Sequence, residues 1–210
     1  MSALQRIAYF QGRRDEIPNQ ELARSLARAQ QSDGIAEIAA NLRNETPAIQ
    51  SDCLKVLYEI GYIQPDLIAP YVSDFLRLLA TRNNRLVWGS MIALATISRL
   101  RAQEIWKQID FVLSAIEHGT LITVVWGIRT LAGVASVAPT SRGRILPILA
   151  EHLEACGARD LPMHAQSILP AVDPLSGGTF LAILEDRQGE LTPSQARRLQ
   201  KVIRQLHPVG

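Results

Sequence analysis

The sequence predicts an all-α fold made of repeated helical hairpins, and three observations support this prediction. Apolar residues recur at intervals of 37 positions along most of the chain. Within each interval they are spaced three or four residues apart, which is the spacing of one face of an α-helix. No segment shows the alternation of β-branched and polar residues that is expected of a strand. Such a repeated helical pattern is typical of proteins that stack similar units one after another.

The repeat consists of parallel series of apolar residues in one register. The first set of series is Ile35, Val72, Ile109 and Leu146; Ile38, Phe75, Val112 and Leu149; and Leu42, Leu79, Ile116 and Leu153. The second set is Leu54, Met91, Ile128 and Ala165; Leu57, Leu94, Leu131 and Ile168; and Ile60, Ile97, Val134 and Ala171. Because the two sets alternate along the chain, each unit is predicted to hold two helices, and these residues are the predicted core.

Length, charge and cysteine content limit the possible functions. The chain of 210 residues can bury one sizeable core, and its 22 basic against 20 acidic residues argue against a dedicated polyanion binder. Cys53 and Cys156 have no C-x-x-C spacing and both lie in apolar helical patterns, so we expect free thiols in a reducing compartment. The sequence shows neither a signal-peptide pattern nor an apolar run that could cross a bilayer. A cytoplasmic protein without a membrane span is therefore expected.

Residues 1–18 are predicted to form an N-terminal arm, and residues 19–210 a single repeat domain with a C-terminal capping helix. In the arm, Leu4, Ile7 and Phe10 have helical spacing, which predicts a short helix that packs on the first repeat. Helices at residues 21–30 and 35–42 should form a terminal capping pair, since their connection is shorter than the later ones.

The next units are predicted at residues 46–80, 83–117 and 120–156. Thr46-Pro47 begins a helix as an N-cap followed by proline, and Gly61 should end that helix. Pro70 should bend the second helix of this unit. Helices are expected near 84–100 and 103–117, and a turn at Pro139-Thr140-Ser141.

A fourth unit begins near Leu161 and is shortened by Pro170, Pro174 and a turn at Gly177-Gly178. Thr192-Pro193-Ser194-Gln195 then has the pattern of a capping box, which begins the last helix. The last helix has an apolar face and a basic face, and the basic residues are Arg197, Arg198, Lys201 and Arg204. The basic face could contact an anion or a membrane surface, but the end of a repeat stack needs a polar outer face in any case.

Residues 86–97, which read Leu-Val-Trp-Gly-Ser-Met-Ile-Ala-Leu-Ala-Thr-Ile, resemble the first helix of a HEAT-like repeat through their Ala-Leu pair. Residues 121–134 resemble it again, with Arg129-Thr130-Leu131-Ala132. The period is slightly shorter than the ~40–47 residues of HEAT and armadillo repeats. The resemblance covers roughly residues 19–186 and implies an α-α superhelix, a HEAT-like helical-hairpin solenoid of about four to five repeats. It also implies that the second helices line a concave face and bind a macromolecule.

The second helices carry the predicted binding residues. Positions opposite the apolar series should face solvent, and they form rows: Glu37, Asp74, Phe111 and Ile148; Ala40, Arg77, Ser114 and Glu151; Pro70, Lys107 and Arg144; Asn44, Thr81 and His118. Phe111 and Ile148 are apolar where the pattern predicts exposure, unless helix curvature or a bend at Pro147 buries them. An exposed apolar pair with charged neighbours suits a protein or peptide partner. The predicted site comprises Phe111, Ile148, Lys107, Arg144, Arg77, Asp74 and His118.

The tryptophans are a separate question. Trp88 and Trp126 are 38 positions apart, one more than the repeat, so they should point about 100° apart around their helices. Trp88 is expected in the core. Trp126 lies one turn before Arg129 and could form a surface cation–π pair with it, the alternative being packing between repeats. Trp106 has no clear partner in the sequence.

Catalytic and metal-binding motifs are not found. His118, His152, His164 and His207 lack the spacing of a metal site, and phosphate-binding loops and nucleophile elbows are missing. We expect a non-catalytic scaffold with no cofactor, no metal and a protein or peptide partner. The resemblance leaves one alternative, a DNA-binding protein or an alkylpurine DNA glycosylase-like enzyme, in which Trp106, Asp110 and Lys107 would supply aromatic, acidic and basic groups. Nucleic acid is not favoured, because a DNA groove should be clearly basic and the rows mix both charges.

Overall fold

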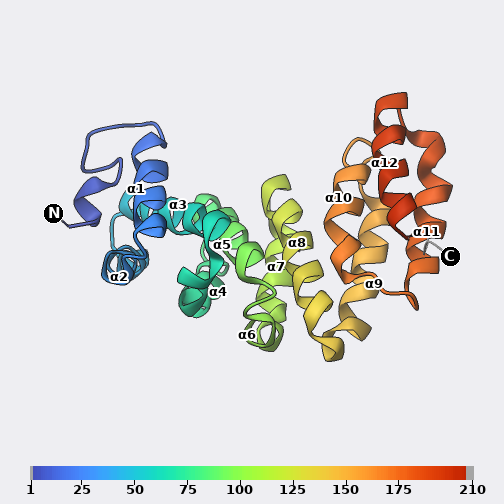
Figure 1. The fold of residues 1–210 in the computed structure, drawn as a ribbon, viewed down its shortest axis with the longest axis horizontal. Helices are drawn as coiled ribbons and strands as arrows, with labels where there is room; N and C mark the ends of the chain where they lie inside the picture. The colour runs from blue at the N-terminus through green and yellow to red at the C-terminus, as the bar shows by residue number, and fades with distance from the viewer. Residues whose placement is uncertain (1, 207–210) are drawn as a thin grey trace. The chain divides into compact units, whose positions relative to one another are not determined.

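The computed structural model describes residues 2–206, which form twelve α-helices joined by short 3-10 turns and contain no strand (Figure 1). Contacts divide the chain into two compact units, one up to Gly127 and one from Ile128 onward, and the boundary lies within α8 (Leu121–Val137). The all-α fold predicted from the sequence is confirmed. Among residues 2–206, no helix is both long enough and apolar enough to cross a membrane.

The first unit begins with an arm and continues through alternating helices. Its elements are η1 (Leu4–Arg6), α1 (Ile17–Arg28), α2 (Ser32–Ala40), η2 (Asn41–Arg43), α3 (Pro47–Ile63), η3 (Pro65–Leu67), η4 (Ala69–Tyr71), α4 (Val72–Leu78), α5 (Asn84–Ile97), α6 (Ala102–Lys107), α7 (Ile109–His118) and the start of α8. Helix α3 packs on α1, α2 and α5, and α4 packs on α5 and α6. These helices therefore contact their neighbours in the stack, as in a repeat protein.

The second unit contains the rest of α8 and four further helices. These are α9 (Pro139–Ala155), α10 (Leu161–Ile168) with η5 (Leu169–Ala171), α11 (Gly177–Asp186) with η6 (Arg187–Glu190), and α12 (Pro193–Leu206). Helix α12 packs on α10 and α11, and α9 packs on α10 and α11. The capping box at the start of α12 is confirmed: the backbone N–H of Thr192 donates to Gln195 Oε1 at 2.8 Å, and the N–H of Gln195 donates to Thr192 Oγ1 at 3.4 Å.

The predicted core residues are buried in both units, except Ile116 and Leu146, which are half-buried. Leu57, Leu94, Leu131, Phe75, Val112 and Leu149 are all inaccessible to solvent, with an exposed fraction of 0%. These residues occupy equivalent positions of successive repeats, so the 37-residue pattern correctly identified one buried stripe on each helix.

Several expected boundaries are wrong, each for a local reason. Gly61 does not end a helix; it lies inside α3, where an added Cβ would overlap Thr96 of α5. Pro70 lies in η4, so α4 begins after the proline instead of bending around it. The expected turn at Pro139–Ser141 is the first turn of α9, because proline is favourable at the first helical position. Gly177-Gly178 likewise begin α11.

The N-terminal arm is held against the first repeat by side chains that accept backbone hydrogen bonds. Ile7 and Ala8 are buried, the N–H of Ala8 donates to Asn19 Oδ1 at 2.9 Å, and the N–H of Tyr9 donates to Asp52 Oδ2 at 2.8 Å. The arm packs on the first repeat as expected, but its short helix is a single 3-10 turn, η1.

Candidate functional site

The predicted second-helix site is divided between the two units. In the first unit, Asp74 and Arg77 lie on α4, Lys107 ends α6, and Phe111 and His118 lie on α7. Lys107, Arg77 and His118 are exposed, and Phe111 keeps 45% of its surface accessible. In the second unit, exposed Arg144 and half-buried Ile148 lie one turn apart on α9.

Of these residues, the structure clearly connects Asp74 and Arg77. The carboxylate of Asp74 forms an ion pair with Arg43 at 3.0 Å and lies 3.6 Å from the guanidinium of Arg77. Arg77 also donates to the carbonyl oxygen of Leu42 at 3.3 Å. These contacts join the segment after α2 to α4, so Asp74 and Arg77 both stabilise the packing of one repeat on the next.

His118 and Thr81, which belong to one predicted row, line the same surface depression of about 220 Å³ between the ends of α4 and α7. His118 Nδ1 lies 3.0 Å from the carbonyl oxygen of Ser114, its neighbour one turn earlier. Phe111 is not part of this depression. The second-helix face of the first unit thus has one exposed aromatic ring among separate polar groups.

A second group of aromatic residues, on the long helices of the first unit, was not identified from the sequence as a site. Tyr58 and Tyr62 of α3 have ring centroids 6.0 Å apart, Tyr58 and Trp88 of α5 are 6.2 Å apart, and Tyr62 and Trp126 of α8 are 5.8 Å apart. All three distances are typical of interacting aromatic rings. The four rings therefore form one connected cluster from three helices, α3, α5 and α8.

The contact between Tyr62 and Trp126 shows how this face is shaped. Helix α5 comes between α3 and α8 in the chain, and it packs directly on α3. Rings from α3 and α8 can meet only if the side chains of this face converge over α5. The contact therefore joins side chains of α3 and α8 across α5.

Much of this cluster is accessible to solvent. Tyr58 is buried beneath the others, but Tyr62 is 48% exposed, and Trp88 and Trp126 are half-buried. Ile122, one turn before Trp126 on α8, is 47% exposed. We refer to Tyr62, Trp88, Ile122 and Trp126 as the aromatic surface.

The expectations for the tryptophans are changed by this geometry. Trp88 was expected in the core, and instead it is half-buried at the edge of the cluster. The ring of Trp126 meets that of Tyr62 at a tilted angle of 44°, and Arg129 donates from Nε to Ser167 Oγ at 3.2 Å. The sequence signal that could have located the surface is the pair Tyr58 and Tyr62, one helical turn apart on the same face.

An ion cluster around the buried side chain of Lys55 borders the aromatic surface. Lys55 Nζ lies 2.7 Å from Glu16 and 2.7 Å from Glu59, and 4.8 Å from the centre of the Tyr58 ring. Burial by itself would lower the pKa of Lys55, but the hydrogen bonds that its ammonium donates to both carboxylates raise it above its ordinary value. Burial also raises the pKa of Tyr58, against the influence of Lys55. Both groups therefore keep their protons at neutral pH.

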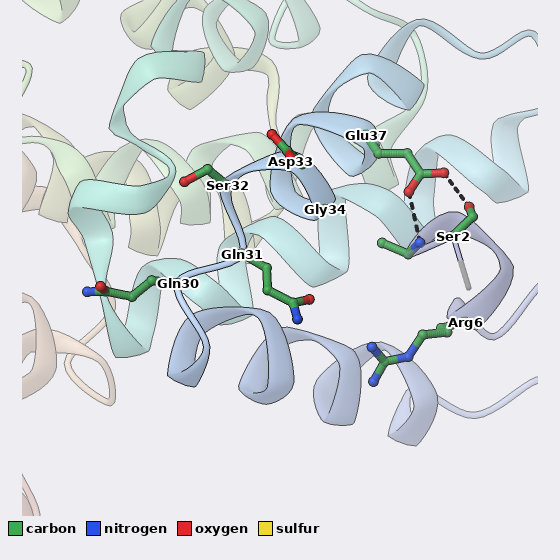
Figure 2. A pocket seen from close by; sticks show the side chains of 9 residues that line it. Ser2, Arg6, Gln30, Gln31, Ser32, Asp33, Gly34 and Glu37 are labelled. Atoms are coloured by element: carbon green, nitrogen blue, oxygen red, sulfur yellow. Dashed lines mark hydrogen bonds between the residues drawn. The ribbon is translucent and has the colours of Figure 1, made fainter.

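An open depression of about 550 Å³ lies between the arm and the loop before α2 (Figure 2). Its carboxylate, Glu37, accepts hydrogen bonds from the Ser2 hydroxyl and, at 2.8 Å, from the N–H of Ala3. The hydrogen bond from Ser2 is the main reason why the pKa of Glu37 is lowered. Because the arm already uses this carboxylate, the depression serves the docking of the arm.

The residues of the enzymatic alternative lie near one another in sequence, on α6 and α7. Trp106 is half-buried on α6, and Lys107 and Asp110 are exposed at the junction of α6 and α7. In the part of the chain that the structure describes, no three His, Cys, Asp or Glu side chains are grouped as metal ligands. His207 lies outside the described residues.

The sequence matches no family model and no curated protein. The fold, in contrast, is similar to solved structures of repeat proteins. A designed armadillo repeat protein in complex with the peptide (KR)4 has a TM-score of 0.69 at 11% identity, over 90% of this chain and 87% of that chain. Another designed armadillo repeat protein has a TM-score of 0.68 at 11% identity over 98% of both chains. An engineered protein has a TM-score of 0.68 at 14% identity, over 98% of this chain and 97% of that chain.

Identities this low establish the fold alone. The protein has the all-helical repeat fold of HEAT- and armadillo-type solenoids, as its sequence pattern predicted. The accessible aromatic side chains of its first unit include the aromatic surface, Phe111 and the pair Tyr9 and Phe10.

Proposed function

We propose that this protein is a scaffold that binds a peptide segment of a partner protein on the aromatic surface. The observation that carries the proposal is the contact of Tyr62 with Trp126, which brings half-exposed rings from separate repeats into one continuous apolar area. Tyrosine and tryptophan dominate the energetics of protein interfaces because they bury a large area at a small cost in conformational entropy. A designed protein of the same fold binds a peptide, which supports this use of the fold.

The second-helix face is the other candidate location for the same activity. Its apolar anchor would be Phe111 of α7, and the first unit also carries Lys107, Asp74, Arg77 and His118 on α4, α6 and α7. Phe111 is exposed to nearly the same extent as Tyr62, at 45% against 48%. The two residues are therefore a matched pair: truncation of each removes an exposed ring of similar size from a different face.

A random-peptide display library selected on the intact protein tests the proposal. Recovered peptides would be titrated against the unmodified protein, Tyr62→Ala, Trp126→Ala and Phe111→Ala, with each variant checked for its melting temperature. We expect Tyr62→Ala and Trp126→Ala to weaken the Kd about tenfold or more, because buried aromatic anchors contribute about 1–3 kcal/mol. Phe111→Ala should leave the Kd unchanged.

The opposite pattern of affinities would place the binding site on the second-helix face. If Phe111→Ala weakens binding and Tyr62→Ala does not, the second-helix face binds the peptide. If the selection yields no peptide whose affinity depends on either face, peptide binding by these two faces is ruled out. Tight binding to duplex DNA that declines steeply with salt would favour the nucleic-acid alternative, since that slope measures the number of phosphate contacts.

A further inference from the structure

The Tyr58 ring, at the base of the aromatic surface, already has a cation on it. Lys55 Nζ lies 4.8 Å from the centre of this ring, and the Lys55 side chain is only 8% exposed. A cation placed this close to an aromatic face satisfies the attraction between a charge and the π electrons of the ring. A Lys or Arg side chain of a ligand would therefore find this position taken.

The carboxylates beside the aromatic surface are also in use. Glu59 and Glu16 each contact Lys55 at 2.7 Å, and Glu16 is 3.5 Å from Arg85. Two acidic and two basic side chains thus form one neutral cluster. A basic ligand would have to compete with Lys55 and Arg85 for these carboxylates, and an acidic ligand would have to displace Glu16 or Glu59.

The groups left accessible are apolar. Tyr62 and Ile122 are about half exposed, and the rings of Trp88 and Trp126 are accessible between them. Charged side chains lose hydration when they are placed against such a surface and regain nothing unless they are paired. Aliphatic or proline side chains gain free energy in the same place, since apolar area is removed from water on both partners.

We infer that the ligand segment on the aromatic surface presents uncharged apolar side chains and is neither a polycation nor a polyanion. This inference rests on the proposed function and specifies the chemistry of its ligand. It also separates this protein from its designed structural neighbour, which was solved with the strongly basic peptide (KR)4.

The peptides from the display selection provide the test. Only those whose binding is weakened by Tyr62→Ala and Trp126→Ala, and not by Phe111→Ala, report on this surface. Their sequences should be enriched in Leu, Ile, Val, Met or Pro and should lack runs of Lys, Arg, Asp or Glu. Their Kd should change less than about twofold when salt is raised from ~0.1 M to ~1 M, although the Debye length decreases from about 10 Å to about 3 Å.

Lys55→Met gives an independent test because it frees both carboxylates. Selection on this variant should enrich peptides with Lys or Arg, and a synthetic (KR)4 peptide should bind it at least about tenfold more tightly than the unmodified protein. Arg85→Gln is the matched control: Arg85 contacts the same Glu16 but is exposed, so its removal leaves Lys55 in place. If Lys55→Met does not fold, Lys55→Gln takes its place.

The two proposals fail in different ways. If no selected peptide depends on Tyr62 or Trp126, the proposed function is wrong. If peptides depend on these rings but are rich in Lys and Arg, or in Asp and Glu, and their Kd weakens strongly with salt, the binding site stands and the inference about its ligand is wrong. Unchanged (KR)4 binding by a folded Lys55 variant would also overturn the inference.

Discussion

His164, on α10, and His152, on α9, form an imidazole pair that is sensitive to pH. Their ring centroids are 4.3 Å apart in an edge-to-face arrangement, and His164 is 98% buried, with only 2% of its surface exposed. His152 Nε2 and His164 Nδ1 are buried without a hydrogen-bond partner. Burial, followed by the charges of His152 and Arg129 and opposed by Asp160, lowers the pKa of His164 from 6.5 to about 4. Burial lowers the pKa of His152 as well.

Because the pKa of His164 is lower in the folded protein than in the unfolded chain, the unfolded chain binds the proton more tightly. The contribution of neutral His164 to the free energy of unfolding is therefore fully present above pH 6.5 and is lost as the pH decreases toward 4. We expect the free energy of unfolding, measured by urea titration, to decrease by about 2 kcal/mol between pH 7 and pH 5. His164→Leu should remove most of this decrease. If the free energy of unfolding of His164→Leu decreases by the same amount, groups other than His164 cause the pH dependence.

Arg187, which precedes the last helix, holds the end of α9. It is 9% exposed, its Nη1 donates to the carbonyl oxygens of Leu153 and Cys156 at 2.7 Å each, and it forms an ion pair with Glu190. Arg187→Ala should lower the free energy of unfolding by about 2–4 kcal/mol, because the carbonyl groups of Leu153 and Cys156 lose the hydrogen bonds that Arg187 donates. Arg197→Ala, on the exposed face of α12, is the control and should change stability by at most about 0.5 kcal/mol. If Arg187→Ala and Arg197→Ala have the same melting temperature, Arg187 does not stabilise the end of α9.

Among the helices, α5 and α7 differ in what their predicted residues do. Leu94 of α5 is completely buried, and Phe111 of α7 is 45% exposed. Leu94→Ala should lower the free energy of unfolding by about 2–5 kcal/mol, from lost burial and the cavity left behind. Phe111→Ala should change it by about 0.5 kcal/mol or less. A similar loss of melting temperature in both variants would mean that Phe111 is a core residue, which would exclude it from binding.

The close approach of α3 and α5 depends on Gly61. An added Cβ there would overlap Thr96 Oγ1 and lie 2.8 Å from Ile68 Cδ1. Gly61→Ala should therefore destabilise the protein by about 1–3 kcal/mol even though alanine favours helices. Gly143→Ala in α9 is the control: nothing lies within 4 Å of its added Cβ, so this substitution should stabilise by up to about 1 kcal/mol. Urea unfolding of Gly61→Ala that matches the unmodified protein would show that the helices can separate without cost.

Some elements could be predicted from the sequence and others could not. The buried stripes and the start of α12 follow from local patterns, since apolar spacing and a capping box act within one helix. The division of the expected helix at residues 103–117 into α6 and α7, and the 3-10 turns before α4, were not predicted. These features depend on how the chain crosses from one helix to the next, and apolar periodicity does not encode that path.

At the scale of the whole molecule, the two units should respond differently to acid. The histidine pair lies in the second unit, and stability in repeat proteins depends mainly on contacts between neighbouring repeats. Hydrogen exchange at pH 5, corrected for the intrinsic effect of pH, should therefore increase in α9 and α10 more than in α3 and α5. The same measurement on His164→Leu should show no such difference. A uniform increase along the chain would mean that the protein unfolds as one cooperative unit.

The sequence by itself determined that the protein is an all-helical repeat with one buried stripe per helix, because that information lies in the spacing of apolar residues. It did not determine which exposed residues meet. Tyr62 and Trp126 are 64 positions apart and do not follow the 37-residue period, yet their rings are 5.8 Å apart. Only the packing of α3, α5 and the start of α8 brings them together. Likewise, Lys55 and Glu16 become neighbours only when the arm folds back on α3. Contacts between side chains of different helices depend on helix rotation and curvature, and the tertiary structure alone decides these.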